Sequence, residues 1–377
     1  MKYITDVPLV ELKGRRVIVR AGLDVPLDDT GEVTDLFRVK QSVETIEYLT
    51  NAGARVIVLS HIGRDPHTTN EAVARALRKF VLARYIPDIT GVAAQQAIAV
   101  MREGEVVLLE NVRSDPREEE NDESFARAIA RLADIYVDDA FSVAHRAHAS
   151  IVGIPKFLPS FAGILMRNEV ETLTGALSPE GPSLAILGGA KFETKAPLVH
   201  KLLDAYDHFL IAGALANDVL KAQNLNVGQS LVSQMVPDES VLNHPHLLVP
   251  VDATVEGGDG QVRVISSNDV LDTDTLVDIG PDTVLMLAPL IHSAKSILWN
   301  GPTGIYEHGY THYTNAIAEL ISASRAHTII GGGDTVAAIQ SSDIVLRNTI
   351  FLSTGGGAML EFLMKGTLPG IEALNNN

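Results

Sequence analysis

Short apolar runs that alternate with longer amphipathic stretches are the feature of this sequence that most restricts its fold. The runs are rich in Val, Ile and Leu, and glycine or polar residues bound them. The stretches between them, such as 39–53, 123–134 and 196–207, have apolar residues at helical spacing. Buried strands separated by helices are typical of parallel sheets made of βαβ units. The pattern therefore predicts an α/β fold in which parallel sheets are flanked by helices.

The number of candidate strands indicates two domains, because ten strands are many for one sheet. The runs lie at 16–20, 55–60, 105–111, 134–141, 183–191, 208–216, 246–255, 296–304, 327–334 and 349–357. Pro155 and Pro159 precede a helix-like segment from Gly163 to Leu173, which is suited to bridge the halves. We expect a first domain at residues 1–162 and a second at 163–363.

Composition excludes several classes of protein. A chain of 377 residues is long enough for two domains with real cores. Its formal net charge of -17 disfavours binding to nucleic acid through the surface as a whole. The absence of cysteine excludes disulfides and thiolate metal sites. The N-terminus does not resemble a signal peptide, and no apolar stretch is long enough to span a bilayer. We expect a soluble cytoplasmic protein.

Glycines follow five of the apolar runs in the second half. One glycine-rich turn only reflects turn geometry, but five favour a site for a nucleotide or a phosphate. Glycine leaves backbone N–H groups exposed beside a helix N-terminus, where they can bind an anion. None of these turns fits the P-loop or the G-x-G-x-x-G pattern. They contain Gly188-Gly189, Gly213, Gly301, Gly331-Gly332-Gly333 and Gly355-Gly356-Gly357.

Charged residues accompany two of these turns. Asp334 follows Gly333 directly, where a carboxylate should repel phosphate. Either Asp334 only caps a helix, or a cation lies between its carboxylate and the anion. Lys191 and Lys195 are four residues apart, a spacing that places two ammonium groups on one face of a helix. A solvated lysine face is the alternative, but we favour contact with phosphate.

In the first half, basic residues follow the apolar runs. Arginine commonly binds carboxylate and phosphate through paired hydrogen bonds. Several such residues at strand ends in an acidic protein favour an anionic substrate, because ligands bind beyond the carboxyl ends of parallel strands. The set consists of Arg20, Arg38, His61, Arg64, Arg113, His145 and Arg146.

These motifs resemble the phosphoglycerate kinase family over nearly the whole chain. The matching segments, in order, are "SHIGR", "LLENVR", "DDAFSVAHRAHAS", "LGGAKFETK", "WNGPTGIYE", "IIGGGDT" and "STGGGA". The resemblance implies two Rossmann-like domains joined by a hinge helix, with residues 364–377 packed back on the first. It implies a monomeric enzyme of glycolysis and gluconeogenesis that transfers a phosphoryl group between 1,3-bisphosphoglycerate and MgADP, in line and after hinge closure, to give 3-phosphoglycerate and MgATP.

The resemblance also implies roles for single residues. The phosphoglycerate would be bound by Arg20, Asp24, Arg38, His61, Arg64, Arg113, His145 and Arg146. The nucleotide would be bound by Lys191, Lys195, Gly213, Asn300, Glu307, Gly331, Gly332, Gly333, Asp334 and Thr335. Catalysis would rest on Arg38, Lys191, Gly333 and Gly356. Asp334 would hold Mg²⁺, which would face the phosphates and so explain an acid in a phosphate site.

The sequence departs from the family after the first strand. The family usually has Asp where this chain has Gly22, and Asn where it has Asp24. Residues two apart in an extended segment point the same way, so we hypothesise that Asp24 takes over the contact with the substrate hydroxyl. Ser142 and Val143 also replace the usual Gly-Thr pair, and Ala212 and Ala214 replace glycines near the expected adenine site.

Two alternatives compete with an active kinase. A paralogue that binds a nucleotide or an anion without efficient catalysis is favoured only by Gly22. Retention of Arg38, Lys191, Lys195 and Asp334 argues against it. A nicotinamide-dependent dehydrogenase needs a dinucleotide fingerprint followed by an acid, and the sequence contains none.

Overall fold

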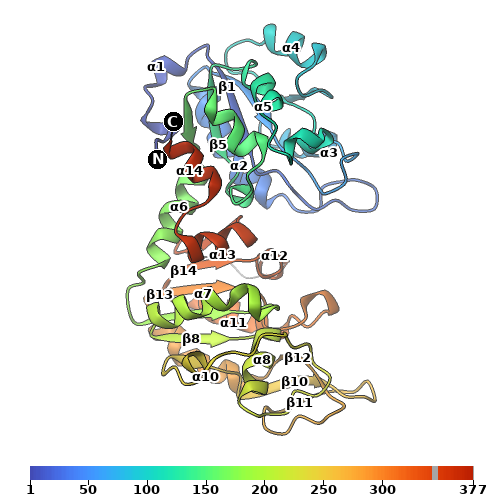
Figure 1. Ribbon diagram of the computed structural model, residues 1–377, viewed down its shortest axis with the longest axis vertical. Helices are drawn as coiled ribbons and strands as arrows, with labels where there is room; N and C mark the ends of the chain where they lie inside the picture. The colour runs from blue at the N-terminus through green and yellow to red at the C-terminus, as the bar shows by residue number, and fades with distance from the viewer. Residues whose placement is uncertain (342–346, 377) are drawn as a thin grey trace. The chain divides into compact units, whose positions relative to one another are not determined.

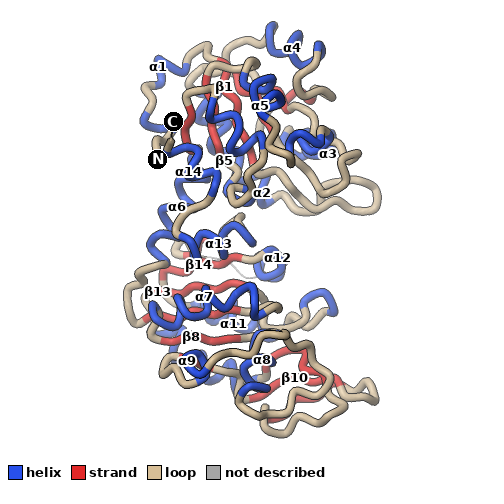
Figure 2. Tube along the Cα trace, viewed as in Figure 1, coloured by secondary structure: helices blue, strands red, loops and turns tan. Residues whose placement is uncertain are grey.

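A computed structural model describes residues 1–341 and 347–376 of the chain, which divides into two compact units (Figure 1). Unit 1 is Met1–Glu171 with Lys365–Asn377, and unit 2 is Thr172–Met364. The division falls within helix α6 (Ile164–Ala176), which stands where the sequence predicts a bridging helix. Figure 2 shows that each unit contains a sheet surrounded by helices.

Unit 1 is built on a six-stranded parallel sheet with the strand order β3-β4-β2-β1-β5-β6. Its strands are β1 (Arg16–Ala21), β2 (Arg55–Leu59), β3 (Ala83–Tyr85), β4 (Val106–Leu108), β5 (Ile135–Asp139) and β6 (Ser160–Ala162). Its helices are α1 (Leu9–Leu12), α2 (Phe37–Asn51), α3 (Glu71–Leu77), α4 (Val92–Ala99), α5 (Glu123–Ala130) and α14 (Pro369–Asn375). The short strands β3 and β6 were not predicted, because Arg84 interrupts the first and Ser160 begins the second, so neither forms a continuous apolar run.

The central strand β1 shows why the apolar runs of this sequence are continuous. Val17 and Val19 belong to the core that includes Val39 and Ile46 of α2. Ile18 points to the opposite face of the sheet and is also fully buried. A strand covered on both faces needs apolar side chains at every position, as the sequence analysis assumed.

Unit 2 repeats this architecture with the strand order β15-β14-β13-β7-β8-β9, again parallel throughout. Its strands are β7 (Ser183–Leu187), β8 (His208–Ile211), β9 (Leu247–Leu248), β13 (Ser296–Asn300), β14 (His327–Gly331) and β15 (Ile350–Leu352). Its helices are α7 (Phe192–Ala205), α8 (Ala214–Ala222), α9 (Glu239–Leu242), α10 (Pro281–Ser293), α11 (His312–Ala323), α12 (Gly333–Ser341) and α13 (Gly356–Lys365). The predicted fold class is confirmed in both units.

One predicted strand of unit 2 is wrong. The run 246–255 forms the two-residue edge strand β9 and then leaves the parallel sheet. Its second part is β10 (Asp252–Glu256), the middle strand of an antiparallel sheet with β11 (Val262–Ser266) and β12 (Thr275–Ile279). Pro250 cannot donate to a strand ladder, and Asp252 accepts hydrogen bonds from the Asp282 and Thr283 amides at the start of α10. The chain therefore turns between the two strands.

Candidate functional site

The carboxyl ends of β1 and β2 bring Arg20 and His61 together in unit 1. Both side chains are 1% exposed. Arg20 donates from Nη2 to Nδ1 of His61 at 2.9 Å, from Nε to Oγ of Ser150 at 2.9 Å, and from Nη1 to the carbonyl oxygen of Ala21 at 2.6 Å. A buried arginine held by three acceptors is rigid, so it fixes the side chain beside it.

Asp24 lies on the other side of His61. Its Oδ2 is 3.5 Å from Nε2 of His61, and its Oδ1 accepts a hydrogen bond from the Gly63 amide at 2.8 Å. Nη1 of Arg38, in the first turn of α2, is 2.6 Å from the Asp24 carbonyl oxygen and 3.9 Å from Oδ2. These side chains and backbone groups form one polar cluster at the edge of the sheet.

The pKa values of His61 and Asp24 determine the charges in this cluster. Burial lowers the pKa of His61 to about 3. The positive charges of Arg20 and Arg113 also lower this pKa, whereas the hydrogen bond to Asp24 and its negative charge raise it. His61 is therefore neutral at neutral pH. Burial opposes ionisation of Asp24, but hydrogen bonds from His61 and the Gly63 amide, with the charge of Arg38, hold the pKa of Asp24 well below its usual value.

The remaining predicted basic residues of unit 1 lie on the loops that follow β2, β4 and β5. Arg113 is largely buried, donates to the Gly63 carbonyl oxygen at 2.7 Å, and pairs with Glu119 at 3.3 Å. Burial and the positive charge of Arg146 lower the pKa of Arg113. Arg146 is half-buried, and its Nε lies 3.4 Å from Nε2 of His145. Arg64 is exposed.

Gly22 is closely packed against its neighbours in this cluster. A Cβ atom added to Gly22 would lie 3.1 Å from Oγ of Ser142 and 3.7 Å from Cα of Ala140. The Ser142 hydroxyl is buried, and among the described residues it has no hydrogen-bond partner. Two of the positions at which this chain departs from the family pattern, Gly22 and Ser142, therefore face each other.

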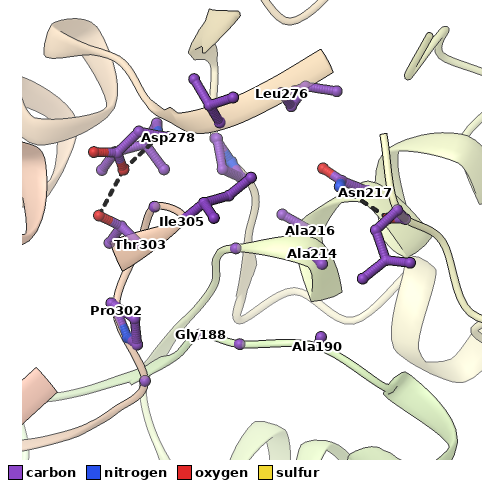
Figure 3. Close-up of a pocket in the computed structure, with 18 of the residues that line it drawn as sticks. Gly188, Ala190, Ala214, Ala216, Asn217, Leu276, Asp278, Pro302, Thr303 and Ile305 are labelled. Carbon is purple, nitrogen blue, oxygen red and sulfur yellow. Dashed lines mark hydrogen bonds between the residues drawn. The ribbon is translucent and has the colours of Figure 1, made fainter. Parts of the chain in front are cut away.

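Unit 2 contains a cavity of 740 Å³ at the carboxyl ends of its strands. Figure 3 shows that its lining comes from the turns after β7 and β13, the start of α8 and strand β12. Its wall is largely apolar, as in many sites for small molecules. Among the predicted residues, the lining includes Lys195, Gly213, Asn300, Glu307, Gly332 and Asp334.

The two lysines do not lie on one helical face, so that part of the prediction is wrong. Lys191 precedes α7 and has a left-handed backbone, with φ of 66° and ψ of 73°. Sequence spacing cannot show where a helix begins, and a left-handed residue ends the helical repeat. Lys195 does lie in α7, and its Nζ donates to the carbonyl oxygens of Gly188 and Ala190 at 3.2 Å each. Burial lowers its pKa.

Helices α12 and α13 both begin with a glycine within four residues of the strand that precedes them. Gly333 starts α12 and Gly356 starts α13, and a Cβ atom added to either would meet nothing within 4 Å. Gly332 has a φ of 95°, which side-chain-bearing residues rarely adopt. Thr335 is buried, and its Oγ1 has no hydrogen-bond partner among the described residues. Open space, exposed N–H groups and an unsatisfied hydroxyl are suited to an anion.

Two carboxylates stand at this end of the cavity. Burial and the negative charge of Glu307 raise the pKa of Asp334. Within residues 1–341 and 347–376, no cluster of three or more His, Cys, Asp or Glu side chains could hold a metal by itself. A single carboxylate suits Mg²⁺ that arrives with a nucleotide, because this ion takes its other ligands from phosphate and water. The donor set therefore fits MgADP or MgATP.

Sequence reasoning missed several polar residues of the cavity. Asp278 accepts hydrogen bonds from Oγ1 of Thr303 and from the Ile279 amide, both at 2.8 Å (Figure 3). Burial raises the pKa of Asp278 to about 6. Asn217 donates to the Leu231 carbonyl oxygen at 3.0 Å. An acid between apolar neighbours in a strand was the available signal for Asp278, whereas Asn217 had none.

In the described part of the chain, no helix combines the length and the apolar character that crossing a membrane requires.

Comparisons with known proteins give a consistent result. The chain matches the family described as Phosphoglycerate kinase over residues 4–366. It is 42% identical to the phosphoglycerate kinase of Moorella thermoacetica, with 97% of each chain covered. The match to the same enzyme from Herpetosiphon aurantiacus is also 42% identical and covers 97% of this chain and 98% of the relative.

Solved structures agree with these matches. The structure of phosphoglycerate kinase from Coxiella burnetii matches with a TM-score of 0.80 and 34% sequence identity. The match covers 99% of this chain and 98% of the Coxiella chain. The phosphoglycerate kinase of Pyrococcus horikoshii OT3 has a TM-score of 0.87 and 30% identity, over 100% of this chain and 98% of its own.

Proposed function

The chain belongs to the phosphoglycerate kinase family, and from this premise we propose which of its side chains bind the substrates and which assist the transfer. The reaction is the reversible transfer of a phosphoryl group between 1,3-bisphosphoglycerate and MgADP, which gives 3-phosphoglycerate and MgATP in glycolysis and gluconeogenesis. Family membership over nearly the whole chain rules out the dehydrogenase alternative.

Unit 1 binds the phosphoglycerate. The observation that carries this assignment is the gathering of Arg20, Arg38, His61 and Arg113 at one edge of its sheet, in a protein of net charge -17. The three arginines of this set create a local positive field, which attracts a small anion that the rest of the surface repels. Arg64 follows β2, and His145 and Arg146 follow β5, so they extend the set at the carboxyl ends of the same sheet.

Asp24 takes the hydroxyl of the phosphoglycerate. Its carboxylate is ionised, and its Oδ2 lies near both His61 and Arg38, so it can accept a hydrogen bond amid groups that hold the rest of the substrate. The family's usual acid is replaced by Gly22, where a Cβ atom would lie only 3.1 Å from Oγ of Ser142, so this position has little room for a side chain. This arrangement supports a shift of the hydroxyl contact by two residues.

Unit 2 binds the nucleotide. The apolar wall of the 740 Å³ cavity suits a purine base, and its glycine-rich end suits the phosphates. Lys195 lines that end and carries the positive charge that phosphate requires. We assign the phosphate contacts to this lysine, Asn300, Thr335 and the glycines Gly213, Gly331, Gly332 and Gly333, and the ribose contact to Glu307.

Transfer needs no general base, because the attacking carboxylate of 3-phosphoglycerate is already ionised at neutral pH. Catalysis then depends on in-line positioning and on neutralising the charge of the moving phosphoryl group. We assign that neutralisation to Arg38, to Lys191 and to the N–H groups at Gly333 and Gly356. Substrates bound in separate units also require the units to close before transfer.

Asp334 holds the Mg²⁺ of the nucleotide. When bound, this ion neutralises part of the phosphate charge and so permits an acid in a phosphate site. Asp334 is also the second residue of α12, where a carboxylate favours the helix N-terminus. The capping and metal-binding interpretations are therefore compatible.

We also propose that the enzyme is cytoplasmic and monomeric. Its role in glycolysis supports the location, which fractionation of cells would test. Sedimentation of the purified chain would test the monomer.

Turnover and binding of Lys191→Ala test the assignment of the catalytic residues. We expect kcat to fall roughly 10²–10³-fold, as when one donor to a developing charge is lost, while MgADP still binds. Lys295→Ala is the control. This exposed lysine also belongs to unit 2, but it precedes β13 and so lies at the amino ends of the strands, away from the proposed phosphate site at their carboxyl ends. Unchanged kcat in Lys191→Ala would contradict the assignment. Absence of turnover in the wild type with MgATP bound would favour the non-catalytic alternative.

A further inference from the structure

A relay of buried, hydrogen-bonded side chains runs from His61 through Arg20 and Ser150 to Glu118 in the interior of unit 1. Arg20 joins His61 to Ser150, and Ser150 in turn reaches Glu118, the last residue of the short 3-10 helix Pro116–Glu118. All four residues are 0–1% exposed. Burying four polar side chains is costly unless each forms hydrogen bonds with the next, as it does here. We therefore infer that the relay serves a purpose beyond packing.

The chemistry of the donors fixes the direction of every hydrogen bond in this relay. Arginine can only donate, so Nε of Arg20 donates to Oγ of Ser150 at 2.9 Å, and Nη2 donates to Nδ1 of His61 at 2.9 Å. The Ser150 hydroxyl therefore directs its own proton to Oε1 of Glu118, at 2.5 Å. The Ser150 amide donates to Oε2 of Glu118 at 2.8 Å.

This direction decides which nitrogen of His61 carries the proton. Nδ1 accepts from Arg20 and has no hydrogen, so the proton of the neutral ring is on Nε2. Nε2 is the nitrogen that faces Oδ2 of Asp24, at 3.5 Å. The relay thus presents an N–H donor to the cluster assigned to the phosphoglycerate.

Glu118 also interacts electrostatically with the positive charge of Arg20. Burial raises the pKa of Glu118, whereas the charge of Arg20 and the two hydrogen bonds from Ser150 act against this rise. The two hydrogen bonds and the nearby guanidinium thus offset part of the cost of burying this carboxyl group. Loss of either partner would leave a charge or a donor without compensation in the core.

We propose that Glu118 and Ser150 are positioning residues for the reaction: through Arg20 they lock His61 as a neutral Nε2–H donor directed at the phosphoglycerate. This inference rests on the proposed role of unit 1. Ser150 contacts Arg20 of the substrate cluster, Glu118 acts through Ser150, and neither residue was predicted from the sequence.

Ser150→Ala is the first test, because it removes the hydroxyl that joins Arg20 to Glu118. In the wild type, nitrogen NMR of the free protein should show a single neutral form of His61, with protonated Nε2 and unprotonated Nδ1. In Ser150→Ala we expect the second neutral form, protonated at Nδ1, to appear. We also expect KM for 3-phosphoglycerate to rise about tenfold, equivalent to 1.4 kcal/mol, with KM for MgATP unchanged.

Ser160→Ala is the matched control. Ser160 is also a buried serine of unit 1 and begins β6, but its hydroxyl donates to the carbonyl oxygen of Leu158, which precedes that strand. A general loss of stability would affect both serine variants, whereas the change at His61 should occur only in Ser150→Ala.

Glu118→Gln is the second variant, for the case that Ser150→Ala does not fold. Glutamine has nearly the same shape but only one acceptor oxygen, so it cannot satisfy both donors of Ser150. A single Nε2–H form and an unchanged KM for 3-phosphoglycerate in the variants would overturn the proposal. A change at His61 without a change in KM would overturn the role in substrate binding. Failure of the wild type to bind 3-phosphoglycerate would count against the proposed function and not against the relay.

Discussion

Gly188 follows β7 and packs against the backbone that follows β13, so we expect Gly188→Ala to destabilise unit 2. The Gly188 amide donates to the Asn300 carbonyl oxygen at 2.8 Å and continues the ladder between the strands. A Cβ atom at this position would lie 2.8 Å from the carbonyl oxygen of Gly301, and it would lie still closer to that of Pro302. Both obstacles are backbone, so neither can rotate away.

The cost follows from this geometry. Ordinary van der Waals contact begins at 3.4 Å, so the Gly301 carbonyl must move by about 0.6 Å, and that of Pro302 by more. Such overpacking costs roughly 1–3 kcal/mol. Loss of the Gly188–Asn300 hydrogen bond adds about 1 kcal/mol. We expect the free energy of unfolding of unit 2 to fall by about 2–4 kcal/mol.

The single tryptophan of the chain makes this loss measurable in unit 2 alone. Trp299 lies in β13, is fully buried, and donates from Nε1 to the Gly301 carbonyl oxygen at 2.8 Å. Its fluorescence therefore reports the transition of unit 2 without that of unit 1. With an m value of about 2–3 kcal/mol/M in urea, the midpoint should fall by roughly 1 M.

Gly357→Ala is the control for this substitution. Gly357 lies in the first turn of α13, and a Cβ atom added there would meet nothing within 4 Å. Alanine in place of a helical glycine should stabilise the protein by about 0.4–1 kcal/mol. A midpoint for Gly188→Ala equal to that of the wild type or of Gly357→Ala would refute the close approach of the two strand ends.

Two further predictions concern unit 1. Asp24→Ala should weaken binding of 3-phosphoglycerate by about 1.5–3 kcal/mol in calorimetric titration, the value of a hydrogen bond to a charged group. Asp29→Ala removes an equal charge from an exposed position and should leave binding of 3-phosphoglycerate unchanged. Tighter binding by Asp24→Ala would contradict the hydroxyl contact and would show that only the net charge matters. Burial raises the pKa of Asp139 to about 7, so the folded state binds this proton more tightly than the unfolded state. Unit 1 should therefore lose up to about 4 kcal/mol through this group as the pH rises from about 4 to 7, and no more above that. Asp139→Asn should remove that part of the pH dependence of the urea midpoint followed by circular dichroism, and an identical slope in the variant would contradict the assignment.

Much of the fold was predictable because its main strands are buried on both faces. The run 16–20 became β1 (Arg16–Ala21), and the run 183–191 contains β7 (Ser183–Leu187) followed by its glycine turn. A continuous apolar run of this length has few other folded states once helices flank it. The antiparallel sheet of β10, β11 and β12 escaped prediction, because the run that contains β10 is no less apolar than the others.

The site was predictable in its residue types and in its place at the strand ends. Parallel strands end at one edge of a sheet, so residues after β1 and β2 had to lie near each other, as Arg20 and His61 do. The local backbone was not predictable. Lys191 adopts a left-handed conformation that its sequence does not reveal, and this removes it from the helical face it was expected to share with Lys195.

The sequence by itself determined the alternation of strands and helices, the glycine turns that suit phosphates, and the basic residues that suit an anionic substrate. These properties are local, since they depend on neighbours within a few residues along the chain. Only the tertiary structure decided which polar groups support the site. Ser150 is 130 residues from Arg20, and Glu118 is 32 residues from Ser150, yet both lie in one buried relay that orients His61. Such contacts arise from the order of strands in the sheet and the paths of the loops between them, and no local pattern in the chain records them.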